Sequence, residues 1–219
     1  MKADHDILIL PKLQTTIEEL VRQFDRIATD RKVIISQLTD FIQQKASQQQ
    51  SVLLNFICTQ NSRRSHIAQI WAQVAAHYYG LNAVECFSGG NEATSFNPKA
   101  VKAMKEEGYE ISILKEGENP VYEVRFSIDA RPASVYSKKY DDPPNPRKDF
   151  AAIMVCSDKD ANCPVVTGAA KKVSLPFEDP KNYDGTPLEA EKYTERVKQI
   201  GREILFAFSQ VRIPKDTSA

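Results

Sequence analysis

The chain has 219 residues, and its 29 lysines and arginines equal its 29 aspartates and glutamates, so the formal net charge is zero. This length suits one α/β domain with an appendage, and zero net charge gives no whole-chain attraction to nucleic acid or to an anionic membrane. The apolar runs are too short to cross a bilayer, and the one before Pro11 is too short for a signal peptide. We therefore expect a cytoplasmic, reducing setting, in which the four cysteines are thiols rather than a disulfide framework.

Residues 1–50 are predicted to form a helical extension. Two apolar stripes at helical spacing lie within residues 12–46, and the segment ATDRK is the expected break between them. Thr15 or Thr16 is the expected N-cap of the first helix. The polar segment KASQQQS that follows is typical of a linker or of a fraying helix end. These features predict a helical hairpin attached to a separate domain over residues 51–219.

The rest of the chain alternates short apolar runs with amphipathic segments. Residues 52–57 form a nearly continuous apolar run, which is typical of a strand buried on both faces of a parallel sheet. Residues 83–88 and 150–156 are further predicted strands, and residues 170–176 are a fourth, weaker one. Helical spacing recurs over residues 64–79, 97–108 and 187–209. In the second of these helices, Asn97 is the expected cap, Pro98 takes the first position and Gly108 ends the helix. This alternation predicts an α/β fold, a parallel sheet with helices on both faces.

Residues 112–149 do not follow this alternation. They contain two β-rich runs on either side of the segment DARP, followed by the proline-rich turn DDPPNP. Such runs around a turn predict an inserted, hairpin-like β segment.

The segment CTQNSRRS joins the first predicted strand to the helix that follows it. Ligands of open α/β sheets gather at the carboxyl ends of the strands, and this turn can aim successive backbone N–H groups at an anion. The N-terminus of the helix adds partial positive charge, and the Arg64 guanidinium can bind two oxygens of a tetrahedral oxyanion. The same field should lower the pKa of Cys58 and make it a nucleophilic thiolate.

The competing interpretation is that Cys58 is a small buried residue that merely ends a strand, which is the more common fate of a lone cysteine. A Cys-x5-Arg spacing alone is a weak signal. Its position between a buried strand and a capped helix favours the anion site, because the chemistry needs that context.

The segment CTQNSRRS resembles the phosphate-binding loop of low-molecular-weight protein tyrosine phosphatases and of their relatives, the thioredoxin-coupled arsenate reductases. The resemblance continues through FSGGNEATSFNPKAVKAMKEEGYEIS, VCSDKDANCP and PFEDPKNYDG. It implies a four-stranded parallel sheet flanked by helices, with Cys58 as nucleophile, Arg64 as oxyanion clamp, Ser65 bonded to the thiolate and Asn61 shaping the loop. The implied oxyanion-binding residues are Thr59, Gln60, Asn61, Ser62, Arg63, Arg64 and Ser65.

Displacing an oxygen from a tetrahedral oxyanion requires protonation of the leaving group. Asp179 precedes Pro180 in a loop after the last predicted strand, and proline restricts the residue before it. Asp-Pro is common in surface turns, so taken alone it favours no function. The resembling families place their general acid at this Asp-Pro, which favours Asp179 as the acid.

Cys156 ends the third predicted strand, and Cys163 follows seven positions later across a polar stretch. The resemblance to arsenate reductases implies a relay, in which Cys156 attacks the Cys58–arsenic adduct and Cys163 then resolves the disulfide for reduction by thioredoxin. Structural zinc is disfavoured because the spacing exceeds the usual Cys-x2–4-Cys. A pair of idle thiols is the other alternative, whereas Cys86 is expected in the core.

Several positions depart from the resembling families, and two of them bear on the relay and on a potassium site. Arg63 stands where arsenate reductases commonly have a cysteine outside the relay, and Gln69 stands where relatives often have a glutamate that helps bind potassium. The second departure argues against a potassium site, so we expect no resident cofactor or metal, with thioredoxin as reductant.

Three functions follow from these features. The first is a thioredoxin-dependent arsenate reductase, and the second is a phosphatase for phosphotyrosine or a small phosphoester. The third is a non-enzymatic anion-sensing module, which is disfavoured because nucleophile, clamp and candidate acid are all present. The Cys156–Cys163 pair favours the first over the second.

Overall fold

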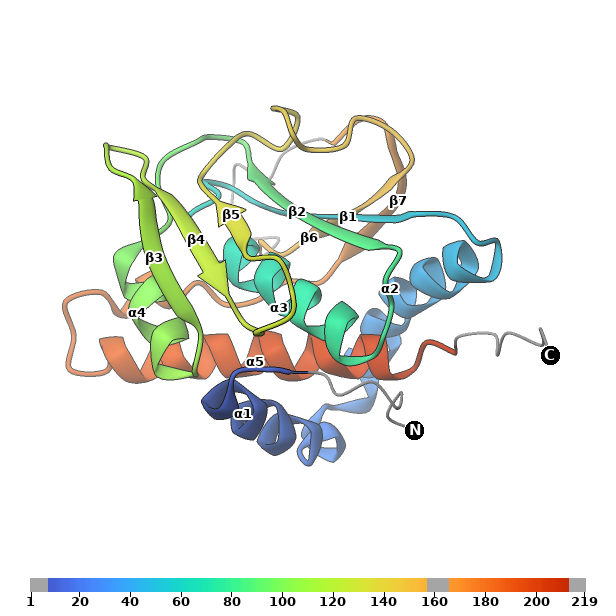
Figure 1. The fold of residues 1–219 in the computed structure, drawn as a ribbon, viewed down its shortest axis with the longest axis horizontal. Coiled ribbons are helices and arrows are strands. Elements are labelled where there is room, and N and C mark those ends of the chain that lie inside the picture. Colours follow the sequence, from blue (N-terminus) through green and yellow to red (C-terminus); the bar gives the residue numbers. More distant parts are fainter. Residues whose placement is uncertain (1–7, 157–165, 213–219) are drawn as a thin grey trace.

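The computed structural model describes residues 8–156 and 166–212. At its centre is a four-stranded parallel sheet in the order β2-β1-β6-β7 (Figure 1). Its strands are β1 (Val52–Cys58), β2 (Val84–Gly90), β6 (Phe150–Met154) and β7 (Ala169–Ser174). All four predicted strands are confirmed. β1 and β6 are the most buried of them, as expected for the centre of a parallel sheet.

Three helices follow the predicted pattern closely, namely α3 (Arg64–Tyr78), α4 (Pro98–Glu106) and α5 (Glu189–Ser209). The side chain of Asn97 accepts a hydrogen bond from the Lys99 amide, 2.9 Å away, and Pro98 occupies the first turn. Gly108 ends the segment with φ +104°, in the region that favours glycine. The start and stop signals in the sequence are therefore confirmed.

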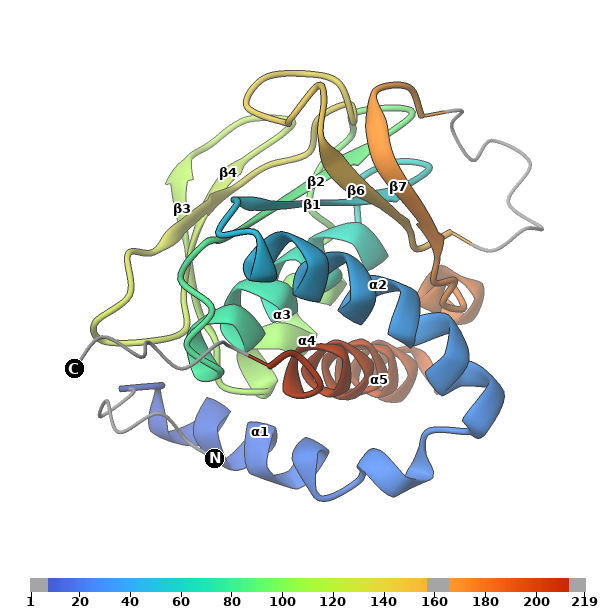
Figure 2. The same ribbon diagram turned by 90° about the vertical axis from the view of Figure 1, so that its right-hand side faces the viewer.

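The prediction of helices on both faces of the sheet is wrong for the described residues. Figures 1 and 2 show the helices gathered on one side of the sheet. On the other side, the Asn55 side chain of β1 donates to the Tyr140 carbonyl, and the Asn145 side chain donates to the Ser88 carbonyl of β2. The physical reason is that the connection from β2 to β6 contains the insert, whose residues 140–145 bond the sheet there.

The insert forms a three-stranded antiparallel sheet in the order β3-β4-β5. Its strands are β3 (Glu110–Lys115), β4 (Val121–Arg125) and β5 (Ala133–Val135). The turn around DARP joins β4 to β5, so the predicted hairpin is confirmed. The sequence reading missed β3, which pairs with β4 and contains few buried side chains.

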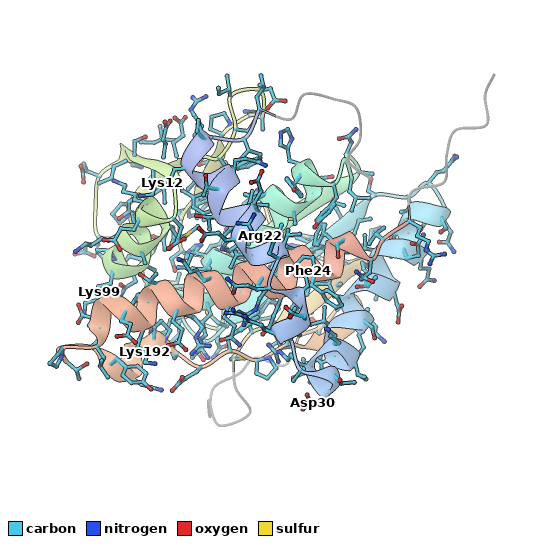
Figure 3. The ribbon with its side chains drawn as sticks, turned by 90° about the horizontal axis from the view of Figure 1, so that it is seen from below. Lys12, Arg22, Phe24, Asp30, Lys99 and Lys192 are labelled. Carbon is cyan, nitrogen blue, oxygen red and sulfur yellow. The ribbon has the colours of Figure 1, made fainter. Side chains whose placement is uncertain are left out.

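The N-terminal extension is helical, but its packing differs from the predicted separate unit. It contains α1 (Pro11–Val21), a 3-10 turn η1 (Phe24–Arg26) and α2 (Thr29–Ser47). Figure 3 shows α1 crossing α5 from below, and the ring of Phe24 meets that of Phe206 edge-on at 5.4 Å. Helix α2 contacts both α5 and the sheet. One hydrophobic cluster therefore includes both the extension and the sheet.

The predicted cap of the first helix is also corrected. α1 begins at Pro11, which suits a first helical position because proline lacks an N–H group. Thr16 lies one turn further on, is buried, and its hydroxyl donates to the Glu107 carbonyl at 3.2 Å. Thr16 thus joins α1 to the end of α4. Among the described residues, no helix is both long enough and apolar enough to span a membrane.

Candidate active site

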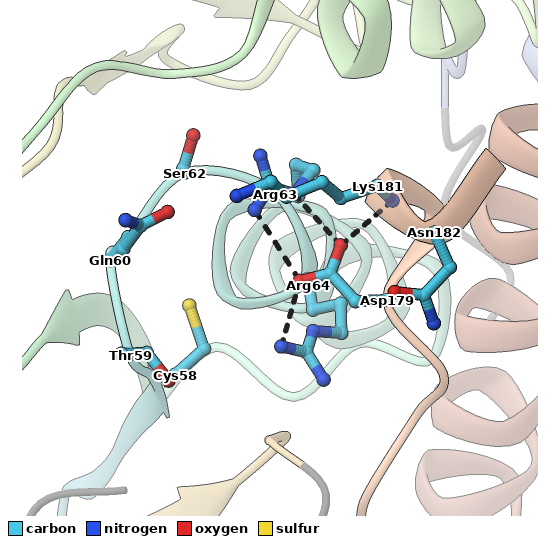
Figure 4. Close-up of a pocket in the computed structure, with 9 residues that line it drawn as sticks. All are labelled: Cys58, Thr59, Gln60, Ser62, Arg63, Arg64, Asp179, Lys181 and Asn182. Atoms are coloured by element: carbon cyan, nitrogen blue, oxygen red, sulfur yellow. Dashed lines mark hydrogen bonds and ion pairs between the residues drawn. The ribbon is translucent and has the colours of Figure 1, made fainter. Parts of the chain in front are cut away.

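The strongest candidate site is a pocket at the carboxyl end of β1 (Figure 4), with a volume of about 210 Å³. Its lining comes from the β1–α3 loop and from the segment around the short 3-10 helix η2 (Pro180–Tyr183). The lining residues are Cys58, Thr59, Gln60, Ser62, Arg63, Arg64, Asp179, Lys181 and Asn182. The structure thus brings together the proposed nucleophile, clamp and acid, although Asp179 is far from the other two in the sequence.

The Cys58 sulfur lies inside a hydrogen-bonded loop. The Ser65 hydroxyl is 3.1 Å from this sulfur, and the Asn61 side-chain amide donates to the Ser65 oxygen at 2.9 Å. Asn61 has φ +43°, a left-handed conformation that asparagine tolerates better than most residues. These contacts match the positions that the family resemblance implies for Ser65 and Asn61.

The loop is held from outside through its carbonyl groups. The Thr59 carbonyl accepts from the Glu92 amide at 3.0 Å, and the Ser62 carbonyl accepts from the Asn97 amide at 2.9 Å. The carbonyl and the N–H of a trans peptide point in opposite directions. The N–H groups of residues 60 and 63 therefore face away from these partners, as an anion-binding loop requires.

The insert holds the same loop, through residues that the sequence reading did not identify. The Ser137 hydroxyl donates to the Gln60 carbonyl at 3.2 Å and accepts from the Thr94 amide at 2.8 Å. The Lys138 amide donates to the Asn61 side-chain oxygen at 2.9 Å. Burial lowers the pKa of the Lys138 ammonium group to about 8. No local sequence pattern marks these residues, because their role rests on contacts with residues more than forty positions away.

A glycine allows the loop and the insert to meet. A side chain at Gly90 would place its Cβ 2.6 Å from the Asn61 nitrogen and 2.8 Å from the Thr59 oxygen. Gly90 also bonds the insert, donating to the Lys138 carbonyl at 3.0 Å and accepting from the Tyr140 amide at 2.9 Å. The end of β2 therefore needs a residue without a side chain.

Asp179 forms ion pairs with both arginines of the loop. Arg63 Nε donates to Asp179 Oδ1 at 2.8 Å, and Arg64 Nη2 donates to Oδ2 at 2.9 Å (Figure 4). Arg64 also donates through Nη1 to the Phe177 carbonyl at 2.8 Å. Burial works to raise the pKa of the Asp179 carboxyl, but Arg64 and Arg63 outweigh it and lower this pKa. Asp179 is thus a carboxylate at neutral pH.

The remaining cysteines differ in their surroundings. Cys156 is buried just after β6, whose residues pair with β1, and Cys58 is the last residue of β1, so the two cysteines lie at the ends of neighbouring strands. Cys163 lies outside the described residues. Cys86 is a buried free thiol of β2, and burial raises its pKa, so its predicted place in the core is confirmed.

The histidines of α3 are not brought together. His66 is fully buried beside Ser88, and burial lowers the pKa of its imidazole. His77 instead faces the carboxylate of Asp129 at 3.2 Å. Within the described ranges, no three His, Cys, Asp or Glu side chains are grouped closely enough to hold a metal ion.

Comparison with known proteins identifies a matching family and several relatives of this chain. The family model described as low molecular weight phosphotyrosine protein phosphatase matches residues 53–119. The arsenate reductase of Bacillus subtilis is 30% identical over 153 residues, which are 69% of this chain and 91% of that protein. The arsenate reductase of Bacillus licheniformis is 31% identical over 150 residues, covering 68% of this chain and 89% of that protein.

Solved structures show lower similarity. An arsenate reductase from Archaeoglobus fulgidus has a TM-score of 0.47 and 15% identity, covering 72% of this chain and 99% of that chain. A thioredoxin-dependent arsenate reductase of Corynebacterium glutamicum has a TM-score of 0.38 and 20% identity, covering 90% of this chain and 84% of that chain. Because the Bacillus subtilis relative is matched over nearly its whole length, the chain belongs to the family of low-molecular-weight phosphotyrosine protein phosphatases and their arsenate reductase relatives.

Proposed function

We propose that this chain is an arsenate reductase, with Cys58 as nucleophile and a thiol relay through Cys156 and Cys163. The observation that carries the proposal is the single pocket that contains the Cys58 sulfur, Arg64 and Asp179. The relatives named arsenate reductase support the choice of substrate. We further propose a cytoplasmic setting, with thioredoxin as the reductant and no resident cofactor.

The proposed reaction needs two electrons, which come from thiols. The Cys58 thiolate attacks arsenic, an S–As bond forms, and one As–O bond breaks with the oxygen leaving as water. The Cys156 thiolate then attacks the Cys58 sulfur. The S–As electron pair goes to arsenic, which leaves as arsenite, and a Cys58–Cys156 disulfide remains. Cys163 resolves this disulfide, and thioredoxin reduces the resulting Cys156–Cys163 bond.

Hydrolysis of a phosphoester is the second candidate function. The match of residues 53–119 to the phosphatase family favours it, and Asp179 lines the pocket, where its protonated form would be the general acid. A phosphatase needs Cys58 and Arg64, but neither of the other two relay thiols. The relay therefore separates the two functions experimentally.

The first test removes the nucleophile or the clamp. Cys58→Ser should abolish turnover of both arsenate and an aryl phosphate, because the hydroxyl is not ionised at neutral pH. Arg64→Lys should cost at least about tenfold in kcat/KM, since an ammonium group cannot replace a bidentate fork. Steady-state assays of both substrates, with and without thioredoxin, measure this. Normal turnover by Cys58→Ser would overturn the site assignment.

The second test examines the relay. Cys156→Ser and Cys163→Ser should each stop repeated arsenate reduction but leave aryl phosphate hydrolysis in place. After one arsenate turnover, Cys163→Ser should accumulate a Cys58–Cys156 disulfide, whereas Cys156→Ser should form none quickly. Peptide mapping detects these species, and Cys86→Ala is the matched control. Full arsenate turnover by either relay variant would favour the phosphatase instead.

A further inference from the structure

Two arginines hold the carboxyl group of Asp179, and their positive charge favours its ionised form over the protonated form that a proton donor needs. Both oxygens of its carboxylate are bonded, because Arg63 reaches Oδ1 at 2.8 Å and Oδ2 at 3.4 Å while Arg64 reaches Oδ2 at 2.9 Å. Lys181 is the third residue that donates to this carboxylate, and its amide bonds Oδ1 at 3.0 Å. The side chains of Arg63 and Asp179 are only 9% and 18% exposed, so solvent screens this pair weakly.

The two arginines are not equivalent once an oxyanion is bound. Arg64 begins α3 and is the clamp for an oxyanion at the Cys58 sulfur, so a bound oxyanion competes with Asp179 for its guanidinium. The Arg63 fork, in contrast, is directed at both oxygens of Asp179. When Arg64 turns to the substrate, Arg63 remains as the partner of the carboxylate.

We propose that Arg63 determines substrate specificity in this pocket, because it keeps Asp179 a carboxylate while an oxyanion is bound and so suppresses hydrolysis of esters with poor leaving groups. This inference rests on the proposed arsenate chemistry at the same site. It is consistent with the direction of the pKa shift of Asp179, which the two arginines lower.

The two reactions differ in where the proton comes from. In ester cleavage, the S–P bond forms, the P–O bond to the alcohol breaks, and a poor leaving alkoxide requires a proton from an acid such as Asp179. Arsenate carries ionisable hydroxyl groups of its own. As the S–As bond forms, one hydroxyl can leave as water after taking the proton of a second hydroxyl. Ionised Asp179 therefore hinders the first reaction much more than the second.

The direct test is the titration of Asp179, measured by NMR of the labelled carboxyl carbon with saturating sulfate, which is a tetrahedral dianion. Arg63→Gln should raise the pKa of Asp179 by about one unit or more, as expected when an adjacent opposite charge is lost. The pKa of Asp179 in Arg63→Lys should lie between its values in Arg63→Gln and in wild type. Lys181→Gln is the matched control, because Lys181 is exposed, lines the same pocket and bonds Asp179 through its backbone amide. Its shift should be clearly smaller.

Kinetics give the corresponding readout. For an aryl phosphate with a poor leaving group, the alkaline limb of the pH profile of kcat should move to higher pH in Arg63→Gln. Hydrolysis at neutral pH should become roughly tenfold faster for each unit by which the pKa of Asp179 rises. Equal Asp179 pKa values in wild type and Arg63→Gln, with sulfate bound, would overturn the inference. If the pKa shifts but wild type reduces no arsenate with thioredoxin, the role of Arg63 stands and the proposed function fails.

Discussion

At the scale of single residues, Asp179 connects function with stability. Its carboxylate pairs with the two arginines that open α3, so it fixes the segment before η2 against the loop. The folded-state pKa of Asp179 lies below its ordinary value. Its contribution to stability is therefore fully present above the pKa of the unfolded chain and is lost as the pH falls through the folded-state pKa.

Asp179→Asn should lower the free energy of unfolding at pH 7 by about 1–3 kcal/mol, because two poorly hydrated arginines lose their charged partner. The difference between variant and wild type should begin to shrink below about pH 4, the ordinary range of an unfolded aspartate, and should be lost once the pH falls below the lowered folded-state pKa of Asp179. Urea denaturation across this pH range measures it. A stability difference that does not change with pH would show that the charge of Asp179 is not what stabilises the fold.

Residues whose role depends on their neighbours in the chain are easier to predict from the sequence than residues that position them from distant parts of the chain. Cys58 and Arg64 were found because a strand end, a loop and a helix start lie next to one another in the chain. Asp179 was predicted through the family resemblance, because an Asp-Pro pair alone is common in surface turns. Ser137 was missed, because a serine in a β-rich insert looks like any other until the fold brings it to the Gln60 carbonyl.

At the scale of elements, the insert supports the β1–α3 loop, which is the proposed oxyanion-binding loop. Ser137 links the Gln60 carbonyl to the Thr94 amide, and Asn119 in turn donates to the Ser137 carbonyl at 2.8 Å. The predicted hairpin was correct, but its purpose could not be read from the sequence, because strand periodicity says nothing about what lies beside a strand.

Ser137→Ala should lower kcat/KM for arsenate by roughly tenfold, equivalent to about 1.4 kcal/mol, because the loop loses an external support. The free energy of unfolding should change less than this, since the loop is a small part of the fold. The matched control is Ser134→Ala, which removes an exposed hydroxyl from the same insert. Equal kinetics for the two variants would show that the insert does not position the loop.

At the scale of the whole molecule, the N-terminal helices belong to the core. Ile17 of α1 and Ile35, Leu38 and Ile42 of α2 are fully buried. The sequence predicted these apolar stripes, yet it could not show that they pack on α5 and the sheet rather than on each other. The polar segment KASQQQS was a misleading boundary, because it contains the last turn of α2 and a surface turn rather than the edge of a domain.

Deletion of residues 1–50 should therefore prevent stable folding. Each fully buried aliphatic side chain contributes about 1.5–3 kcal/mol, so the loss of several exceeds the total stability of about 5–15 kcal/mol typical of a domain. Circular dichroism and thermal unfolding of the truncated protein measure this. If a protein of residues 51–219 is soluble and active and unfolds cooperatively, residues 1–50 are a separate unit rather than part of the core.

A pair of variants on α2 makes the same test within the intact chain. Leu38→Ala should cost about 2–5 kcal/mol, because it opens a cavity in the core. Val33→Ala should stay within about 0.5 kcal/mol, since Val33 is 63% exposed.

Helix α5 has a consequence for the order in which the protein is made. It is the last element of the described chain, and it contacts α1, α2, α3 and α4. During synthesis, those four helices and the oxyanion loop emerge from the ribosome long before the surface that covers them. The nascent chain must therefore wait, with apolar faces exposed to chaperones, until α5 is translated.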